Sequence, residues 1–190
     1  ASTHEGEDEQ LLDVFGQVRG QFPDCLLVLV PRHPERFASV AELARSRGYE
    51  TLLRSERRPC SETTGVFVGD SMGELPLFYA ASDVAFVGGS LVHHGGHNLL
   101  EPAALGIPVV TGPAVFNFTE ISRLLLGAGA CEQVENSSEL SRVVSHWLGD
   151  ANERHRVGQS GKQVVEKNRG ALQAVLDMIN RYLSEVKSES

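Results

Sequence analysis

The sequence predicts an α/β fold built on a doubly wound parallel sheet of about six strands, with helices on both faces. Short apolar runs alternate with amphipathic helical segments along the whole chain, which is the pattern of βαβ units. The run VAFV at residues 84–87 is short and wholly apolar, as expected of a strand buried on both faces. Polar or glycine-rich loops follow nearly every run, and such loops converge on one edge of a parallel sheet.

Each predicted strand is a short apolar run bounded by glycine, proline or polar residues. The run CLLVLV at residues 25–30 is followed by Pro31, and the run VAFV at residues 84–87 is followed by Gly88 and Gly89. Runs of this length with such boundaries are typical of buried strands. In chain order, we expect strands at residues 25–30, 49–53, 66–68, 84–87, 108–111 and 130–134.

The predicted helices carry apolar side chains at helical spacing and end at helix-breaking residues. Residues 7–21 place Leu11 and Val18 on one face, and Pro23 closes the segment. Gly48 stops the next helix. In chain order, we expect helices at residues 7–21, 35–47, 75–81, 98–105, 121–126, 139–148, 152–167 and 171–186.

Length and composition are those of an ordinary globular chain. Its 190 residues fit one domain, or one domain with appended helices. The net charge of −8 disfavours nucleic-acid binding and, for this segment alone, binding to an anionic membrane surface. No apolar stretch approaches the roughly 20 residues of a membrane span. Cys25, Cys60 and Cys131 are dispersed without metal-ligand spacing, so we expect reduced thiols in a cytosolic compartment.

The first residues, ASTHEGEDE, look like the tail of a strand entering a helix. Because the chain begins there at Ala1 without a methionine, we expect a fragment of a longer protein. His4, Glu5 and Glu7 follow this strand end, near the predicted switch in strand order. A catalytic carboxylate is one interpretation, but acidic residues in a first turn usually complement the helix dipole, which we favour. The roles of His4 and Glu5 stay open.

The densest functional signal lies in residues 83–113. Gly88 and Gly89 let the backbone turn sharply after a strand, and we expect a helix to start near His97 with free N–H groups. A strand, a glycine turn and a helix N-terminus together form a phosphate site. Asn98 and Glu101 share one face at that point and are candidate ribose ligands. The alternative for Glu101 is a carboxylate that complements the helix dipole.

The motif PRHPER at residues 31–36 ends the strand at residues 25–30. The guanidinium of Arg32 suits phosphate oxygens, and His33 offers one more hydrogen bond. The alternative is a helix cap with a salt bridge between Arg32 and Glu35. For Arg36 the two interpretations are balanced.

The motif GDSMGE at residues 69–74 follows the strand at residues 66–68. Asp70 and Ser71 are either caps of the next helix or part of a loop that binds a nucleobase, with Met72 against the ring. The sequence does not separate these two interpretations.

His93, His94 and His97 lie in a glycine-rich loop without the spacing of a helical pair, and no Cys or Asp stands beside them. We therefore expect no metal site. His97 is a candidate phosphate contact, while the roles of His93 and His94 stay open. No G-x-G-x-x-G follows the first strand, which disfavours a NAD-dependent dehydrogenase.

Three motifs together, PRHPER, GDSMGEL and GGSLVHHGGHNLLEPAALGIPVVTGP, closely resemble the bacterial 3-deoxy-D-manno-octulosonic acid (Kdo) transferases of lipopolysaccharide synthesis. The opening STHEGED fits the same family, so the likeness runs from residue 1 to about residue 148. The resemblance implies the C-terminal, donor-binding, Rossmann-like half of a GT-B glycosyltransferase. Members of this family transfer Kdo from CMP-Kdo to a lipid A precursor at the cytoplasmic face of the inner membrane, with inversion and without a metal or cofactor.

The resemblance also implies roles for individual residues. Residues 1–150 would form the CMP-Kdo binding domain, and residues 151–190 would form helices that pack on it or toward an N-terminal domain. The general base, the acceptor site and the membrane anchor belong to that N-terminal half, so we expect no catalytic residue and no activity in this chain alone. The implied donor ligands are Arg32 and His33 for the phosphate, Ser71, Met72, Gly73 and Glu74 for cytosine, Gly89 and Ser90 at the phosphate turn, and Asn98 and Glu101 at the ribose. Alternatives are the donor half of a UDP-sugar enzyme and a non-catalytic nucleotide-binding domain.

Overall fold

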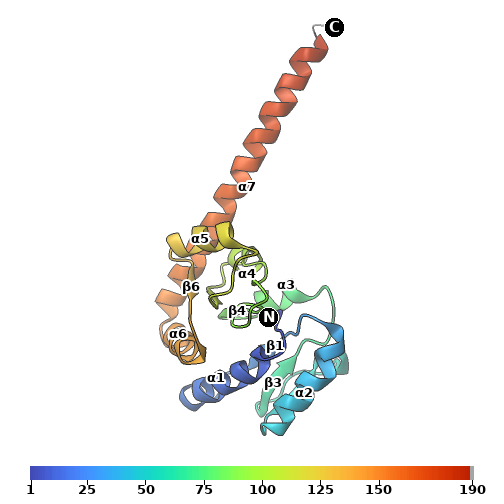
Figure 1. Ribbon diagram of the computed structural model, residues 1–190, viewed down its shortest axis with the longest axis vertical. Coiled ribbons are helices and arrows are strands. Elements are labelled where there is room, and N and C mark those ends of the chain that lie inside the picture. The colour runs from blue at the N-terminus through green and yellow to red at the C-terminus, as the bar shows by residue number, and fades with distance from the viewer. Residues whose placement is uncertain (189–190) are drawn as a thin grey trace.

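The computed structural model describes the backbone of residues 1–188 and the side chains of residues 1–169. Six parallel strands form two three-stranded sheets, ordered β1-β3-β2 and β4-β5-β6 (Figure 1). The predicted α/β class and the six strands are confirmed, although the strands divide into two sheets. The strands are β1 (Leu27–Leu29), β2 (Glu50–Leu53), β3 (Thr64–Val68), β4 (Ala85–Val87), β5 (Val109–Thr111) and β6 (Cys131–Gln133).

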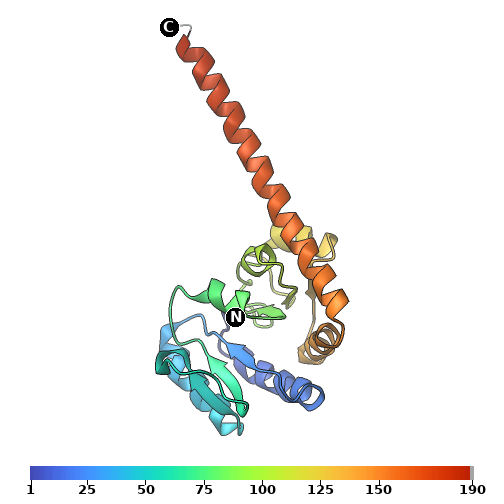
Figure 2. The same ribbon diagram turned by 180° about the vertical axis from the view of Figure 1, so that it is seen from behind.

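The first three residues lie between the two sheets and hydrogen-bond to both. On one side, the N–H of Gly88 donates to the carbonyl of Ala1 at 2.8 Å. On the other side, the N–H of Thr3 donates to Val30 at 3.3 Å, and the N–H of Arg32 donates to the carbonyl of Thr3 at 3.0 Å. The chain start lies between the sheets in opposite views (Figures 1 and 2). Residues 1–3 therefore hold the end of β1 beside the end of β4.

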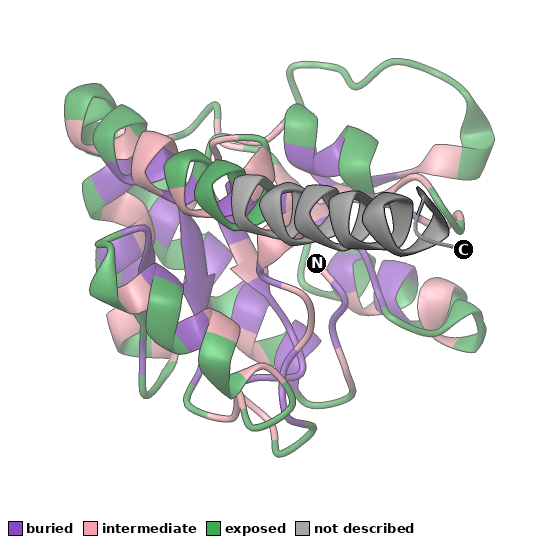
Figure 3. Ribbon diagram, turned by 90° about the horizontal axis from the view of Figure 1, so that it is seen from above, coloured by how far each residue is buried: buried purple, intermediate pink, exposed green. Residues whose placement is uncertain are grey.

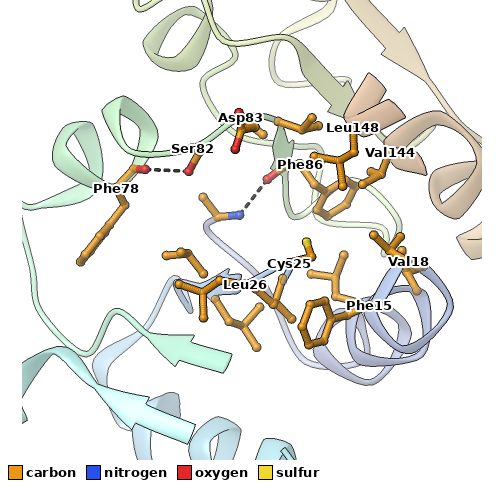
Figure 4. A pocket seen from close by; sticks show the side chains of 18 of the residues that line it. Phe15, Val18, Cys25, Leu26, Phe78, Ser82, Asp83, Phe86, Val144 and Leu148 are labelled. Carbon is orange, nitrogen blue, oxygen red and sulfur yellow. Dashed lines mark hydrogen bonds between the residues drawn. The ribbon is translucent and has the colours of Figure 1, made fainter. Parts of the chain in front are cut away.

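Behind these residues, a cavity of about 480 Å³ separates β1 from β4 (Figure 4). Both strands pair on one side only, β1 with β3 and β4 with β5. Apolar side chains from the two strands and from the first and sixth helices dominate the lining. These include Phe15, Val18, Leu26, Phe86, Val144 and Leu148. None of the predicted ligand residues lines this cavity.

Helices cover the sheets, and buried residues gather on the strands and on the inner faces of the helices (Figure 3). One core joins α1, α2 and α6 to the first sheet, and a second joins α4, α5 and α7 to the second sheet. Trp147 of α6, which is 2% exposed, belongs to the first core. The helices are α1 (Glu7–Gln21), α2 (Phe37–Ser46), α3 (Leu75–Ala80), α4 (Leu100–Ala104), α5 (Thr119–Gly127), α6 (Ser137–Gly149) and α7 (Ala151–Ser188), with short 3-10 helices at Pro34–Arg36 and Arg54–Glu56.

The two predicted C-terminal helices, at residues 152–167 and 171–186, are one continuous helix, α7, of 38 residues. The prediction of a break near Gly170 was wrong. A glycine inside a helix costs only about 1 kcal/mol relative to alanine, which the helix-forming residues on either side offset. The beginning of α7 packs closely on the second half of the domain. An added Cβ at Gly158 would lie 1.9 Å from the carbonyl oxygen of Gly106.

Candidate functional site

The loops that follow β1, β3 and β4 meet at one edge of the two sheets. The carboxyl ends of β1 and β3 are aligned, because Leu29 pairs with Val68. Those of β4 and β5 are aligned as well, because Val87 pairs with Thr111. Residues 1–3 lie between the edge strands β1 and β4. The strand order runs from β1 into one sheet and from β4 into the other. This is the switch point at which open α/β sheets bind ligands.

Four histidines gather at this switch point. The Nε2 atoms of His4 and His97 are 2.8 Å apart, and their rings are nearly parallel. The ring of His4 also stacks on His94, with centroids 4.1 Å apart, and meets the edge of His33 at 5.4 Å. The sequence alone assigns no role to His4 or His94. The fold places both beside the candidate phosphate contact His97.

The surroundings hold the facing imidazoles of His4 and His97 in their neutral form. Burial, followed by His4 and Arg32, lowers the pKa of His97 to about 4. Burial, followed by His94, also lowers the pKa of His4, against the opposing effect of Glu7. At neutral pH one ring therefore donates the hydrogen bond across the 2.8 Å contact and the other accepts it.

The guanidinium of Arg32 lies at this edge as an exposed cation. Arg32 is exposed and close enough to His97 to lower its pKa. Its side chain has no hydrogen bond or salt bridge to any other side chain that the structure describes, so the alternative pairing with Glu35 is absent. His33 is likewise exposed beside it. Both predicted phosphate ligands are therefore accessible to an anion.

Arg36, by contrast, is part of the scaffold. It donates to the carbonyl of Thr3 at 2.8 Å and forms a salt bridge with the buried carboxylate of Asp8. The hydroxyl of Thr3 donates to the same carboxylate at 2.6 Å. Burial raises the pKa of Asp8, while Thr3 and Arg36 oppose the shift. These contacts fix the loop after β1 on the start of α1.

Glu7 occupies the donors of the glycine turn. Its carboxylate is fully buried and accepts hydrogen bonds from four backbone N–H groups, those of His4, Gly89, Ser90 and Leu91, at 2.7 to 3.0 Å. The backbone N–H groups of Gly89 and Ser90 at the predicted phosphate turn therefore donate within the fold. Gly89, with φ +69°, instead leaves room for the histidine pair, because an added Cβ would lie 3.1 Å from His97.

The hydroxyl of Ser90 is also engaged within the fold. Ser90 is fully buried, donates to the carbonyl of Val87 at 2.6 Å and accepts from the N–H of Gly112 at 2.8 Å. It thereby ties the end of β4 to the end of β5. A direct role for Ser90 in binding a ligand stays a prediction.

The helix expected to start near His97 begins at Leu100 and has five residues. The side-chain oxygen of Asn98 accepts from the N–H of Leu100 at 3.0 Å, which satisfies one of the N–H groups that were expected to be free. The amide nitrogen of Asn98 donates to Glu101 at 3.1 Å. The structure thus brings Asn98 and Glu101 together, both half-buried, as one polar pair next to His97.

The loop after β3 is organised around Glu74. Its carboxylate accepts from the hydroxyl of Ser71 and from Arg54, the latter at 2.9 Å. These contacts, that of Ser71 first, lower the pKa of Glu74. No side chain caps α3, so the capping alternative for Ser71 is absent. Gly73 takes a φ of +82°, and Met72, which is 60% exposed, projects from the loop.

Sequence reasoning missed Glu7 and Asp8 as organising residues, although a signal was present. The two acidic side chains stand on the apolar face of α1, since Glu7, Leu11, Val14 and Val18 follow helical spacing. Carboxylates in a buried stripe need partners, whereas carboxylates that only complement a helix dipole face water. Both are at most 1% exposed.

Within residues 1–169, no three His, Cys, Asp or Glu side chains converge as a metal-binding group. None of the helices in the described part of the chain combines the length and apolar character that crossing a membrane requires.

A family described as "Glycosyl transferases group 1" matches residues 5–164. The chain belongs to the group 1 glycosyl transferases. Among solved structures, it is similar to the C-terminal CMP-Kdo binding domain of WaaA from Acinetobacter baumannii, with a TM-score of 0.82, 34% identity and coverage of 86% of both chains. The C-terminal domain of the group 1 protein LpcC from Francisella tularensis shares the fold, with a TM-score of 0.60 at 14% identity over 86% of this chain and 78% of that one.

Curated relatives agree with this assignment. The 3-deoxy-D-manno-octulosonic acid transferase of Haemophilus influenzae is 48% identical over 96% of this chain and 43% of its own length. That of Bordetella pertussis is 34% identical over 96% of this chain and 44% of its own length. The chain therefore spans less than half the length of these relatives. The predicted resemblance to the Kdo transferases, and to the C-terminal half of a GT-B fold, is confirmed.

Proposed function

We propose that this chain is the donor-binding domain of a Kdo transferase and that it binds CMP-Kdo at the loops after β1, β3 and β4. The observation that carries the proposal is the likeness, at 34% identity over 86% of both chains, to a solved CMP-Kdo binding domain. The geometry agrees, because an unpaired guanidinium at Arg32 and two exposed or half-exposed imidazoles, His33 and His97, stand at the switch point of the sheets.

In the proposed complex, the phosphate lies against Arg32, His33 and His97. The exposed side chain of Met72 packs on the cytosine, in the loop shaped by Ser71, Gly73 and Glu74. The Asn98–Glu101 pair receives the ribose hydroxyls, since one carboxylate oxygen and the amide nitrogen can share a diol.

The proposed reaction breaks the bond between the anomeric carbon of Kdo and the phosphate oxygen of CMP. A base on the N-terminal half of the longer enzyme takes the proton of an acceptor hydroxyl, whose oxygen attacks the anomeric carbon with inversion. The bonding electrons leave with the phosphate, where negative charge grows. Arg32 and the neighbouring imidazoles stabilise that charge, which lowers the barrier.

The remaining features of the proposal concern the longer enzyme. Its N-terminal half supplies the lipid A precursor site and the membrane contact at the cytoplasmic face of the inner membrane. On this view the present chain binds the donor but does not transfer Kdo by itself.

Calorimetric titration of the chain with CMP and with UDP tests the proposal. We expect CMP to bind more tightly. Tighter binding of UDP would indicate a UDP-sugar enzyme, and heat from neither nucleotide would refute a donor site here. Kdo transfer by the full-length protein is the second measurement, because donor binding without turnover would indicate a non-catalytic nucleotide-binding domain.

A further inference from the structure

We propose that His4 and His97 act as one proton-sharing pair that binds the nucleotide phosphate and takes up a proton from solvent as the phosphate arrives. The inference rests on the proposed function for the identity of the ligand. The proton uptake is inferred from the geometry of the pair. His4 is new to the site, since sequence reasoning had assigned it no role.

The contact between the two rings fixes how many protons they hold. The Nε2 atoms are 2.8 Å apart, so a hydrogen bond joins them and one of the two nitrogens carries no proton. As long as this bond exists, neither Nε2 offers an N–H group to a ligand. If the unprotonated nitrogen gains a proton, both nitrogens become donors and can no longer bond to each other. Two N–H groups are then available for two oxygens of one phosphate.

The groups that face the pair come from several loops. Arg36, His33 and His94 act on the charge of His4, and Arg32 and the α-amino group of Ala1 act on that of His97. All of these disfavour a positive charge on the pair. Glu7 is the carboxylate that favours it in both rings. In the free protein burial, which is the largest cause, and the positive groups together outweigh Glu7, and the pair stays neutral.

A phosphate reverses this balance. The phosphate monoester of CMP carries about two negative charges near pH 7, and beside Arg32 these outweigh the surrounding cations and favour protonation of the pair. No bond in the ligand is made or broken in this step. One proton moves from solvent to an imidazole, and the Nε2–Nε2 hydrogen bond is exchanged for two N–H···O bonds to the phosphate. The space for this rearrangement exists because Gly89 has no side chain beside His97.

The fold holds the pair at the point where the phosphate is proposed to bind. The N–H of His4 donates to the Glu7 carboxylate, which also holds the glycine turn. His97 follows that turn closely in the chain, and the N–H of Gly96 donates to the carbonyl of Gly89 at 2.8 Å. Each ring is therefore positioned by its own backbone attachment and not only by its partner.

Proton-linked calorimetry tests the inference. CMP is titrated into the wild-type chain and into the His97→Gln and His4→Gln variants, in buffers that differ in ionisation enthalpy, at about pH 7. The control is His146→Gln, at an exposed histidine near the end of α6. Because CMP titrates identically in every experiment, differences between the proteins report the histidines alone. A thermal melt of each protein confirms that it is folded.

We expect the wild type and the His146→Gln control to take up about half to one proton more per bound CMP than either pair variant. From about pH 6 to about pH 8, wild-type affinity should fall about 3- to 10-fold more than that of the variants. In NMR titrations, an imidazole of the pair should titrate near pH 4 in the free protein and at higher pH with CMP bound.

Three results would overturn the inference, and they differ in whether the donor site is excluded as well. CMP that binds with equal proton uptake by the wild type and both pair variants would eliminate the proton-sharing role and leave the donor site intact. An absence of CMP binding to the folded wild type would remove the donor site together with the role of the pair. If the variants do not fold, the NMR titration of the wild type decides. Histidine pKa values that do not change when CMP binds would overturn the inference.

Discussion

The carboxylate of Glu7 accepts a hydrogen bond from the N–H of Gly89 at 2.7 Å, across 82 positions of sequence. The same carboxylate holds the N–H groups of His4, Ser90 and Leu91. A buried charge with four donors is compensated for its loss of water. This contact joins the loop after residues 1–3 to the loop after β4, so the proposed donor site depends on a residue that itself touches no ligand.

Replacing Glu7 by glutamine should destabilise the chain by about 2–4 kcal/mol, because an amide has one acceptor oxygen and turns its NH2 group toward N–H donors. Urea denaturation measures the loss. The matched control is Glu5→Gln in the turn just before α1, where Glu5 is exposed and a change below about 0.5 kcal/mol is expected. Equal stability of the two variants would show that the Glu7 contacts contribute little.

Substitution of Arg32 should weaken CMP binding, whereas substitution of Arg36 should reduce stability. Arg32→Ala removes an exposed cation without side-chain partners, so it should weaken CMP binding by about 1.5–3 kcal/mol and leave the melting temperature unchanged. Calorimetry and a thermal melt provide the two measurements. A loss of stability without a loss of affinity would instead return Arg32 to a structural role.

Arg36→Ala should reduce stability by about 2–4 kcal/mol, because it leaves the carboxylate of Asp8, which is 1% exposed, without its cation. Burial raises the pKa of Asp8 above its usual 3.8, so the folded state favours the protonated acid. The deficit relative to wild type should therefore shrink as pH falls through the pKa of Asp8, since a protonated carboxyl needs no cation. Urea denaturation at a series of pH values measures it. A deficit that stays constant or grows on acidification would contradict this assignment.

Local patterns in the sequence predicted the parts of the fold that local chemistry determines. The helix α1 has the predicted bounds, because apolar spacing runs unbroken from Glu7 to Gln21. The six strands lie within or close to the predicted runs. The wholly apolar runs that form β1 and β4 are stable only where both faces are covered. The convergence of strand-end loops followed from parallel pairing alone.

The contacts that organise the site could not be predicted in the same way. The partners of Glu7 and His4 lie 82 and 93 positions away in sequence, and no periodicity reports such a pair. The late start of α4 depends on whether Asn98 continues the helix or caps it, and both choices are locally acceptable for asparagine. In each case tertiary packing decides between alternatives that the chain leaves open.

The three cysteines should react at very different rates. Cys60 is exposed, whereas burial raises the pKa of Cys25 and that of Cys131, the latter to about 12. Since the thiolate is the reactive form, an aromatic disulfide reagent should label one thiol per folded chain quickly. In Cys60→Ser this fast phase should disappear. A fast phase of two thiols in the folded wild type would contradict the protection of Cys25 or Cys131, and a fast phase of three would contradict the protection of both.

Glu101→Ala should weaken CMP binding by about 1.5–3 kcal/mol while changing stability by less than about 1 kcal/mol, because Asn98 still caps Leu100 when its second partner is removed. Asn98→Ala should lose both affinity and about 0.5–2 kcal/mol of stability, since the cap disappears with the side chain. Glu120→Ala, at an exposed glutamate in the first turn of α5, is the control. Calorimetry and urea denaturation separate the three variants, and unchanged affinity in Glu101→Ala would exclude Glu101 from the site.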